Sequence, residues 1–120
     1  MEIKITKRKK LLEINNDMCH NYYYLVHGRI YNDDHTAYRR FKFIPWFDIF
    51  DVDEYFNYDD ENDTWNENLI TQKMIKEYLE ECIWAYVSMV TDYNNENQLR
   101  NFYDMCDDSI SNYNRIAKYW

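Results

Sequence analysis

The first 44 residues alternate apolar and polar side chains in the manner of β-strands. Three segments rich in alternating apolar, aromatic or β-branched residues predict strands over residues 2–14, 20–31 and 36–44. Short clusters of Asn and Asp separate these segments and are typical of turns. Three such strands with short connections should form an antiparallel meander.

The third predicted strand should present different chemistry on its two faces. Arg40 and Lys42 should point to one side of the sheet, because alternate residues of a strand share a face. Phe41 and Phe43 should point to the other side. One face of the sheet should therefore be packed and the other solvated. Gly28, inside the second predicted strand, indicates a bulge or the close approach of another backbone.

The second half of the chain shows helical periodicity. Apolar residues recur at intervals of three and four from Met74 to Val90, and a second run of the same kind extends from Leu99 to Ala117. Asn94 and Asn95 interrupt the pattern between them. Two long helices joined by a short loop should form an antiparallel hairpin. The apolar faces of that hairpin should cover the sheet.

The segment between sheet and helices is less regular. Pro45 ends the third strand, and the aromatic and aliphatic residues that follow favour a short helix over residues 46–56. Thr64 followed by Glu67 has the form of a capping box, which marks the start of a helix.

These elements predict the α+β fold class in a single domain, residues 1–120. The predicted parts are an antiparallel, three-stranded meander (1–44), an acidic, aromatic connection (45–67) and an antiparallel helical hairpin (68–120).

The composition indicates the type of protein and its cellular compartment. Aromatic residues make up 19% of the chain, which is typical of a folded protein, and there is one Gly and one Pro. No apolar run approaches the ~18 residues that a membrane helix needs. The three cysteines are not spaced as in a disulfide framework, which favours a reducing, cytoplasmic location.

Charge is distributed unevenly. Residues 1–42 hold nine Lys or Arg and five Asp or Glu, whereas residues 43–120 hold five and seventeen, for a total of −8. The thirty residues from Phe43 to Gln72 contain nine acids and no Lys or Arg. Because like charges at this density repel one another, their presence favours a positively charged partner.

Motifs of common enzymes and metal sites are missing. The chain has no Gly-rich phosphate loop, no strand–Ser–helix elbow and no His-Glu-x-x-His zinc pattern. Pairs of carboxylates are expected by chance in so acidic a chain. The sequence therefore predicts a protein that is not an enzyme, with no catalytic residue, cofactor or metal site.

The acidic connection is the predicted partner-binding site. Carboxylates held at fixed spacing can replace the phosphates of a duplex, and aromatic residues between them can anchor an interface. The predicted site comprises Asp48, Asp51, Asp53, Glu54, Tyr55, Tyr58, Asp59, Asp60, Glu61, Asp63, Trp65 and Glu67.

The basic N-terminal strands support a second interpretation, a small nucleic-acid-binding accessory protein. Together with the run Tyr22–Tyr24, their cations resemble a strand surface with stacking groups. A sequence pI of 4.8 weighs against it, because phosphate-binding domains are usually basic overall. A third interpretation is an assembly protein that dimerises through the helical hairpin. The cations of the second interpretation are Lys7, Arg8, Lys9, Lys10, Arg39 and Arg40.

A short, acidic chain that is nearly free of glycine and rich in Tyr, Asn and Asp resembles the phage-encoded anti-CRISPR proteins. Within that type, FKFIPWFDIFDVDEYF followed by TQKMIKEYLEECIW is most similar to inhibitors of type II (Cas9) effectors. The resemblance implies an inhibitor that binds Cas9 or its guide-RNA complex in the cytoplasm of the host bacterial cell. The basic strands depart from a wholly acidic mimic and leave open a contact with guide RNA.

Overall fold

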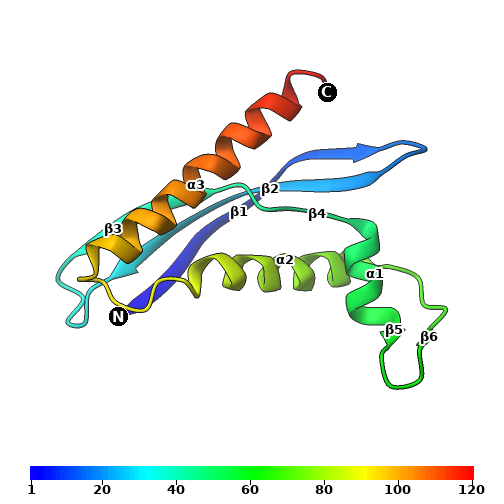
Figure 1. Ribbon diagram of the computed structural model, residues 1–120, viewed down its shortest axis with the longest axis horizontal. Helices are drawn as coiled ribbons and strands as arrows, with labels where there is room; N and C mark the ends of the chain where they lie inside the picture. Colours follow the sequence, from blue (N-terminus) through cyan, green and yellow to red (C-terminus); the bar gives the residue numbers. More distant parts are fainter.

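The computed structural model describes residues 1–120, and the predicted α+β class is confirmed. An antiparallel sheet is followed by helices, of which the last two are long (Figure 1). The elements are β1 (Glu2–Asn15), β2 (His20–Tyr31), β3 (Tyr38–Phe43), β4 (Trp46–Asp48), α1 (Ile49–Asn57), β5 (Tyr58–Asp59), β6 (Thr64–Trp65), α2 (Gln72–Val87) and α3 (Glu96–Ala117).

Strand β2 lies at the centre of the sheet. It pairs with β1 on one side and with both β3 and β4 on the other, always antiparallel. The edge is interrupted between β3 and β4, where Pro45 has no N–H to donate. There the Ile44 N–H donates instead to Ser109 Oγ in α3 at 2.9 Å, and the Pro45 carbonyl accepts from the Tyr24 N–H at 3.1 Å. Helix α3 thereby fixes the break in the edge strand.

The helix predicted over residues 46–56 begins later than expected. Trp46 and Phe47 belong to β4, and they alternate between 49% and 2% exposure as strand residues do. Asp48 then caps α1: its carboxylate accepts the Asp51 N–H at 2.9 Å, and the Asp51 carboxylate accepts the Asp48 N–H at 3.1 Å. This is a capping box built from two aspartates.

The capping box predicted at Thr64 and Glu67 is wrong. Thr64 lies in β6, and α2 begins at Gln72 with Thr71 as its N-cap. The apolar stripe of α2 starts only after that cap, and Leu69 is 88% exposed. A helix beginning near residue 64 would therefore have no apolar face to bury, and burial of such a face is what stabilises most short helices.

The sheet has an inner face that packs against α1 and α2, and an outer face on the opposite side. Alternate residues of β2, including Tyr24, Val26 and Ile30, point to the inner face. Three aromatic side chains bind the helices to this face. They are Tyr78 of α2, which meets Phe47 of β4 edge-on at 5.0 Å between ring centroids; Tyr86 of α2, which stacks on Phe43 at 4.4 Å; and Phe102 of α3, which meets Phe41 edge-on at 5.2 Å.

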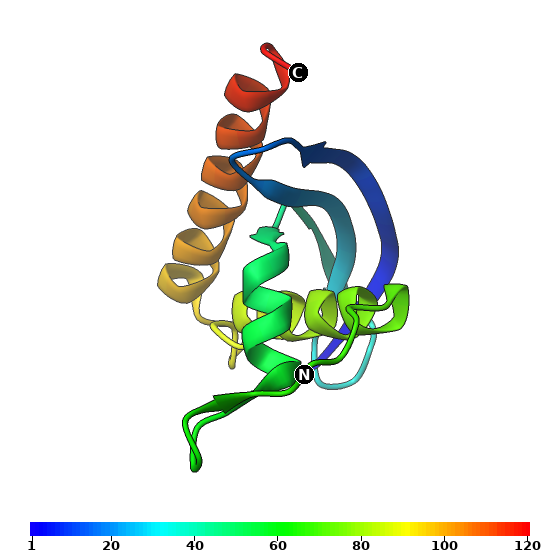
Figure 2. The same ribbon diagram turned by 90° about the vertical axis from the view of Figure 1, so that its right-hand side faces the viewer.

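Helix α3 crosses from the inner to the outer face at the β3 edge. Its first half, with Leu99 and Phe102, belongs to the inner core. Its second half packs on a smaller cluster at the far end of the outer face, where Tyr113 meets Tyr23 at 5.7 Å. In Figure 2, α1 and α2 stand in front of the sheet and α3 lies along one side of it. The rest of the outer face is left uncovered by helices.

The chain reverses direction between α2 and α3, as the sequence predicts. From that reversal the two helices diverge, and each packs on the sheet (Figure 1). None of the helices combines the length and hydrophobicity that crossing a membrane requires.

Gly28 confirms the predicted close approach. A Cβ added there would lie 2.3 Å from the Phe41 ring and 2.8 Å from the Lys4 carbonyl oxygen. Opposite this glycine, β1 carries a register shift between Ile5 and Lys7, and a second shift follows between Lys10 and Leu12. Such bulges increase twist and change which residues share a face.

Candidate partner-binding surface

The acidic connection folds into an arm, which we define as residues 49–67. It consists of α1 and the two-stranded β5–β6 ribbon, in which Tyr58 pairs with Trp65 and Asp59 with Thr64. Figures 1 and 2 show this ribbon projecting from the body beyond the end of α1. The most acidic part of the sequence therefore lies on a protrusion.

One side of α1 attaches the arm to the body. Val52 is completely buried, and Ile49 and Phe56 pack against the inner core. Tyr55 meets Tyr78 of α2 edge-on at 5.6 Å. The carboxylate of Glu81 in α2, beside the Tyr55 hydroxyl, raises the pKa of Tyr55. The helical part of the arm is thus packed against α2, while its ribbon extends beyond it.

The ribbon is linked to α1 by aromatic residues. Trp65 lies 4.9 Å from Tyr58 and 5.7 Å from Phe50, measured between ring centroids. Phe50 remains 56% exposed and Trp65 45% exposed. These rings hold the ribbon against the helix and still present the kind of aromatic surface that anchors protein interfaces.

Asn57 closes the base of the ribbon and was not singled out by the sequence. Its buried amide nitrogen donates to the Asp53 carboxylate at 2.7 Å and to the Asn68 carbonyl at 3.1 Å. The backbone carbonyl of Asn57 accepts the Asn66 N–H at 2.6 Å. The residue joins the chain entering the ribbon to the chain leaving it. In the sequence, the only sign of this role is an Asn that stands among the apolar and acidic residues of the arm.

None of the nine acids between Phe43 and Gln72 forms an ion pair; all eight ion pairs of the protein lie elsewhere. Five of the nine are hydrogen-bonded within the arm or at its start, and these are Asp48, Asp51, Asp53, Asp59 and Asp63. The side chains of the other four make no hydrogen bond, and these are Glu54, Asp60, Glu61 and Glu67.

The tip of the ribbon is organised by Asp59. Its carboxylate accepts the Asn62 side-chain amide at 2.8 Å and the backbone N–H groups of Glu61 and Asn62 at 3.0 and 3.3 Å. These hydrogen bonds to the charged form hold the pKa of Asp59 below its usual range. Such side-chain-to-backbone bonds are typical of Asx turns, and this one fixes residues 59–62.

Two tyrosines report the negative field of the arm. The pKa of Tyr58 is raised, first by its hydrogen bond to Asp63 and further by nearby carboxylates that include Asp60 and Glu54. Burial raises the pKa of Tyr78 in α2 to about 12, and three acids of the arm and its start contribute to that shift. Acids of α1 and its cap therefore act on the surface of α2, and Glu54 acts on the ribbon as well.

The six cations of the second interpretation do not share one face. Lys7, Lys9 and Arg40 lie on the outer face, opposite or beside outer-face residues of β2. The other three point to the inner side and are paired: Arg8 with Glu80 through two hydrogen bonds, Lys10 with Glu13 at 2.8 Å, and Arg39 with Glu96 at 2.6 Å. The run Tyr22–Tyr24 is buried, so these rings do not offer stacking surfaces.

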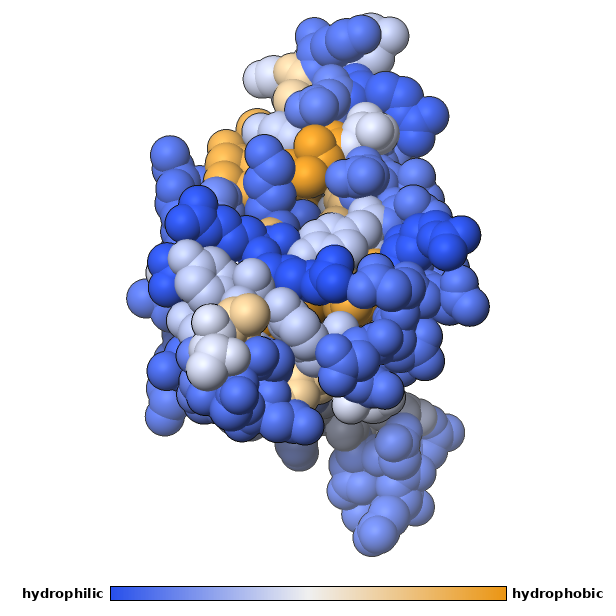
Figure 3. Space-filling model, turned by 90° about the vertical axis from the view of Figure 1, so that its left-hand side faces the viewer, coloured by the Kyte–Doolittle hydropathy of each residue, from blue (hydrophilic) through white to orange (hydrophobic).

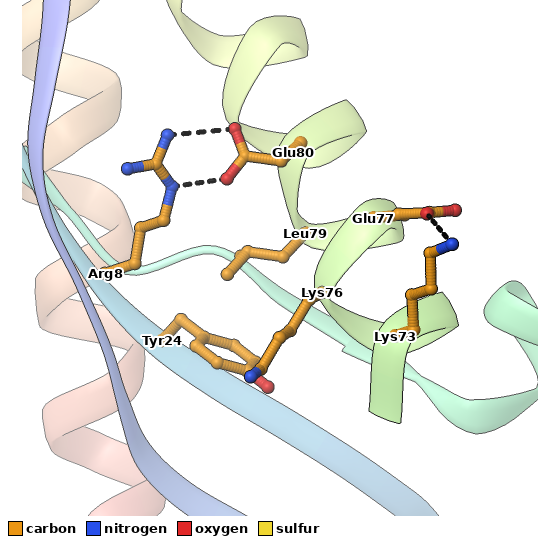
Figure 4. A pocket seen from close by; sticks show the side chains of 7 residues that line it. All are labelled: Arg8, Tyr24, Lys73, Lys76, Glu77, Leu79 and Glu80. Atoms are coloured by element: carbon orange, nitrogen blue, oxygen red, sulfur yellow. Dashed lines mark hydrogen bonds and ion pairs between the residues drawn. The ribbon is translucent and has the colours of Figure 1, made fainter. Parts of the chain in front are cut away.

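The largest pocket, about 650 Å³, lies between the β1–β2 hairpin and α2 (Figure 4). Its charges largely neutralise one another, because Arg8 pairs with Glu80 and Lys73 lies 3.8 Å from Glu77. No group of three or more His, Cys, Asp or Glu converges anywhere in the protein to hold a metal ion. The remaining lining residues are Tyr24, Lys76 and Leu79.

No protein-family model matches the chain, and no curated protein or solved structure matches it. Its function is therefore inferred below from the charge and geometry of its own residues.

Proposed function

We propose that the protein is a non-enzymatic inhibitor of a CRISPR–Cas effector of the Cas9 type. Its arm would bind a basic surface where that effector otherwise holds nucleic acid. The observation that carries this proposal is that nine carboxylates without a cationic partner lie on and beside an ordered projection. A surface rich in Lys and Arg would supply the missing cations. The choice of effector rests on the sequence resemblance described above.

The division of labour among the acids supports this proposal. The five hydrogen-bonded carboxylates build the frame of the arm, whereas Glu54, Asp60, Glu61 and Glu67 are left to bind a partner. Holding these side chains on a fixed frame reduces the conformational entropy that binding would otherwise lose. Phe50 and Trp65 would add apolar contact beside the charges.

A charge-reversal variant of the free carboxylates tests the proposal without disturbing the frame. The variant Asp60→Lys, Glu61→Lys, Glu67→Lys is compared with Asp17→Lys, Asp104→Lys, Asp108→Lys, which makes the same charge change at exposed positions outside the arm. Affinity for a purified Cas9–guide complex is measured by interferometry over a salt series. The arm variant should lose about 100-fold or more in affinity, since close charge pairs at interfaces are each worth ~1.5–7 kcal/mol.

The control variant should stay within a few-fold of the wild type. Unchanged affinity and salt dependence of the arm variant would overturn the role of the arm. If the wild-type protein bound no Cas9–guide complex, the assignment of the effector would be wrong.

A further inference from the structure

The outer face of the sheet carries a set of cations that no acid neutralises. We define the basic face by these five residues, none of which appears in an ion pair; they are Lys7, Lys9, Arg29, Arg40 and Lys42. Figure 3 views the molecule from the side opposite to Figure 2, and the most hydrophilic residues form a band across the middle of that view. The chain as a whole is acidic, so this concentration of positive charge is local.

The register arranges this charge in two rows across the strands. In one row, Lys7 of β1 lies opposite His27 of β2, which lies opposite Lys42 of β3. In the next row, Lys4 lies opposite Arg29, and Arg29 opposite Arg40. Neighbouring strands in a sheet are ~4.8 Å apart, so the second row holds like charges directly opposite one another, whereas in the first row His27 separates the two lysines. Like charges directly opposite each other destabilise a sheet.

Local contacts relieve only part of this repulsion. The ring of Tyr38 lies 4.8 Å from the Arg29 guanidinium carbon and 5.8 Å from that of Arg40, so it spreads between the two cations. Burial, and after it the nearby Lys7 and Lys42, lower the pKa of His27, which disfavours a further positive charge between the two lysines. A row of cations that repel one another in this way is typical of a surface that binds an anion.

Acids lie only at the margins of the basic face. Glu2 is at one end, 3.9 Å from Lys4 and 3.2 Å from His35. Asp107 of α3 lines a hollow beside Arg40 and Lys42, on the side where α3 runs along the sheet. The centre of the face remains open and positively charged.

We propose that the basic face binds the phosphate backbone of a single-stranded nucleic acid. Alternate residues of a strand are ~6.6 Å apart, so Arg40 and Lys42, which lie in the two rows on the same strand, can contact successive phosphates of an extended chain. Surfaces of this kind combine a basic track with aromatic rings, and Tyr38 supplies an exposed ring, 42% accessible, within the track.

The surroundings of the basic face favour a single strand. Helix α3 covers the far end of the outer face and borders it on one side, which leaves a track and not a broad plane. A charge of −8 on the whole protein repels duplexes and anionic membranes, which extend over the acidic regions as well. The apolar residues next to the basic face, such as Leu25, are partly buried against the cluster at the far end of the outer face, so they do not form an exposed surface that could insert into a bilayer.

This proposal goes beyond the one for the arm and does not depend on it. The arm projects past α1, which packs on the inner face, whereas the cations lie on the outer face. The molecule could therefore hold a basic protein and a nucleic acid at the same time, as a protein–RNA complex would require.

A matched pair of triple variants tests the basic face. Lys7→Gln, Arg40→Gln, Lys42→Gln removes three of its cations, and Lys73→Gln, Lys76→Gln, Lys118→Gln removes three exposed cations elsewhere. The probes are fluorescein-labelled oligo(U) and oligo(dT) of about 20 nucleotides, which exceeds the ~4–16 that one small binding domain covers. Fluorescence anisotropy is recorded over a salt series, and circular dichroism checks that both variants fold.

The wild-type protein should bind both single strands with a log–log salt slope of about −2, as expected for three phosphate contacts at ~0.7 each. The basic-face variant should lose at least about tenfold in affinity and nearly all of that slope. The control variant should bind within a few-fold of the wild type, and so should the arm variant described above. The last result separates failure of this proposal from failure of the first.

Three results would overturn the proposal. The first is no binding of either oligonucleotide at low salt. The second is equal weakening by the two triple variants, which would mean that only net charge matters. The third is tighter binding of a duplex of the same length, or of vesicles containing phosphatidylserine, than of the single strands.

Discussion

The arm and the basic face carry opposite charges and are held in place by different means. The cations of the basic face stand on strands whose backbone groups bond to neighbouring strands, with the inner core behind them. The arm has short elements, and its own carboxylates hold it together. Five of the nine acids in the arm and at its start are occupied in this way. The number of acids in the sequence is therefore larger than the number of carboxylates that the arm has free to bind a partner.

The same difference predicts unequal stability. Opening the ribbon breaks a few hydrogen bonds around Asn57 and exposes the rings of Phe50 and Trp65, which are already about half exposed. Opening the sheet exposes the inner core. Segments with few buried contacts open at low free energy, whereas core strands open only near the global unfolding free energy. The substitutions below should separate these two regions, and they are arranged from the largest expected effect to the smallest.

Removing a core ring should destabilise the sheet most. Phe102 is completely buried in the inner core against Phe41, so Phe102→Ala should lower the free energy of unfolding by about 3–5 kcal/mol. Urea unfolding followed by circular dichroism gives this value. Tyr119→Ala, at an 82% exposed position, is the control and should change it by less than about 0.5 kcal/mol. A loss below about 1 kcal/mol would mean that α3 is not part of the core.

The arm should be the region affected by Asn57→Ala. The substitution leaves the Asp53 carboxylate and the Asn68 carbonyl without their donor, which should cost about 1–3 kcal/mol locally. Hydrogen exchange should speed up at residues 58–68 and stay unchanged in β1 and β2. Asn101→Ala, on the exposed side of α3, should leave both regions unchanged. Uniform loss of protection across the chain would contradict the separation of the two regions.

A smaller effect is expected at the start of α1. Asp48→Ala removes the N-cap and should cost about 0.5–2 kcal/mol, whereas Asp48→Asn keeps an acceptor and should cost much less. The amides of α1 should exchange faster in the first variant, and the urea midpoint should fall slightly. Equal effects of Ala and Asn would indicate that the charge of Asp48 matters, and not its hydrogen bond.

Much of the fold could be predicted because its patterns are unambiguous. The period of two in the first 44 residues and the Asn-rich turns located three strands, and the period of 3.6 located α2 and α3. The prediction was wrong where a short aromatic run fits either a strand or a helix. At Trp46 and Phe47 the choice was made by pairing with β2, which no local pattern reveals.

The candidate surfaces were harder to predict, because they depend on tertiary contacts. The acidity of the arm is plain in the sequence, but the division between bonded and free carboxylates depends on the turn at Asp59 and on Asn57. The basic face depends on a bulge. Without the register shift after Ile5, Lys7 would point to the side opposite Lys4, since side chains alternate along a regular strand.

The smallest effect should come from His27, and it tests whether the two rows of the basic face are arranged as described. Lys7 and Lys42 lie on either side of its imidazole, and Arg40 and Asp107 line the neighbouring hollow. Because burial and the two lysines lower its folded-state pKa below the ~6.5 of an unfolded chain, its contribution to stability is present above that pH. That contribution is lost as the pH falls through the unfolded and then the folded pKa.

An NMR titration of His27 should therefore give a pKa below 6.5, and the double variant Lys7→Gln, Lys42→Gln should raise it. In the wild type, saturating oligo(U) should raise the pKa of His27, since phosphates offset the nearby positive charge. In the double variant, oligo(U) should have little effect on this pKa. The arm variant should titrate like the wild type, because its carboxylates are remote from the outer face. An ordinary pKa for His27 that does not respond to the double substitution would mean that Lys7 and Lys42 do not flank it. The basic face would then not be a continuous track.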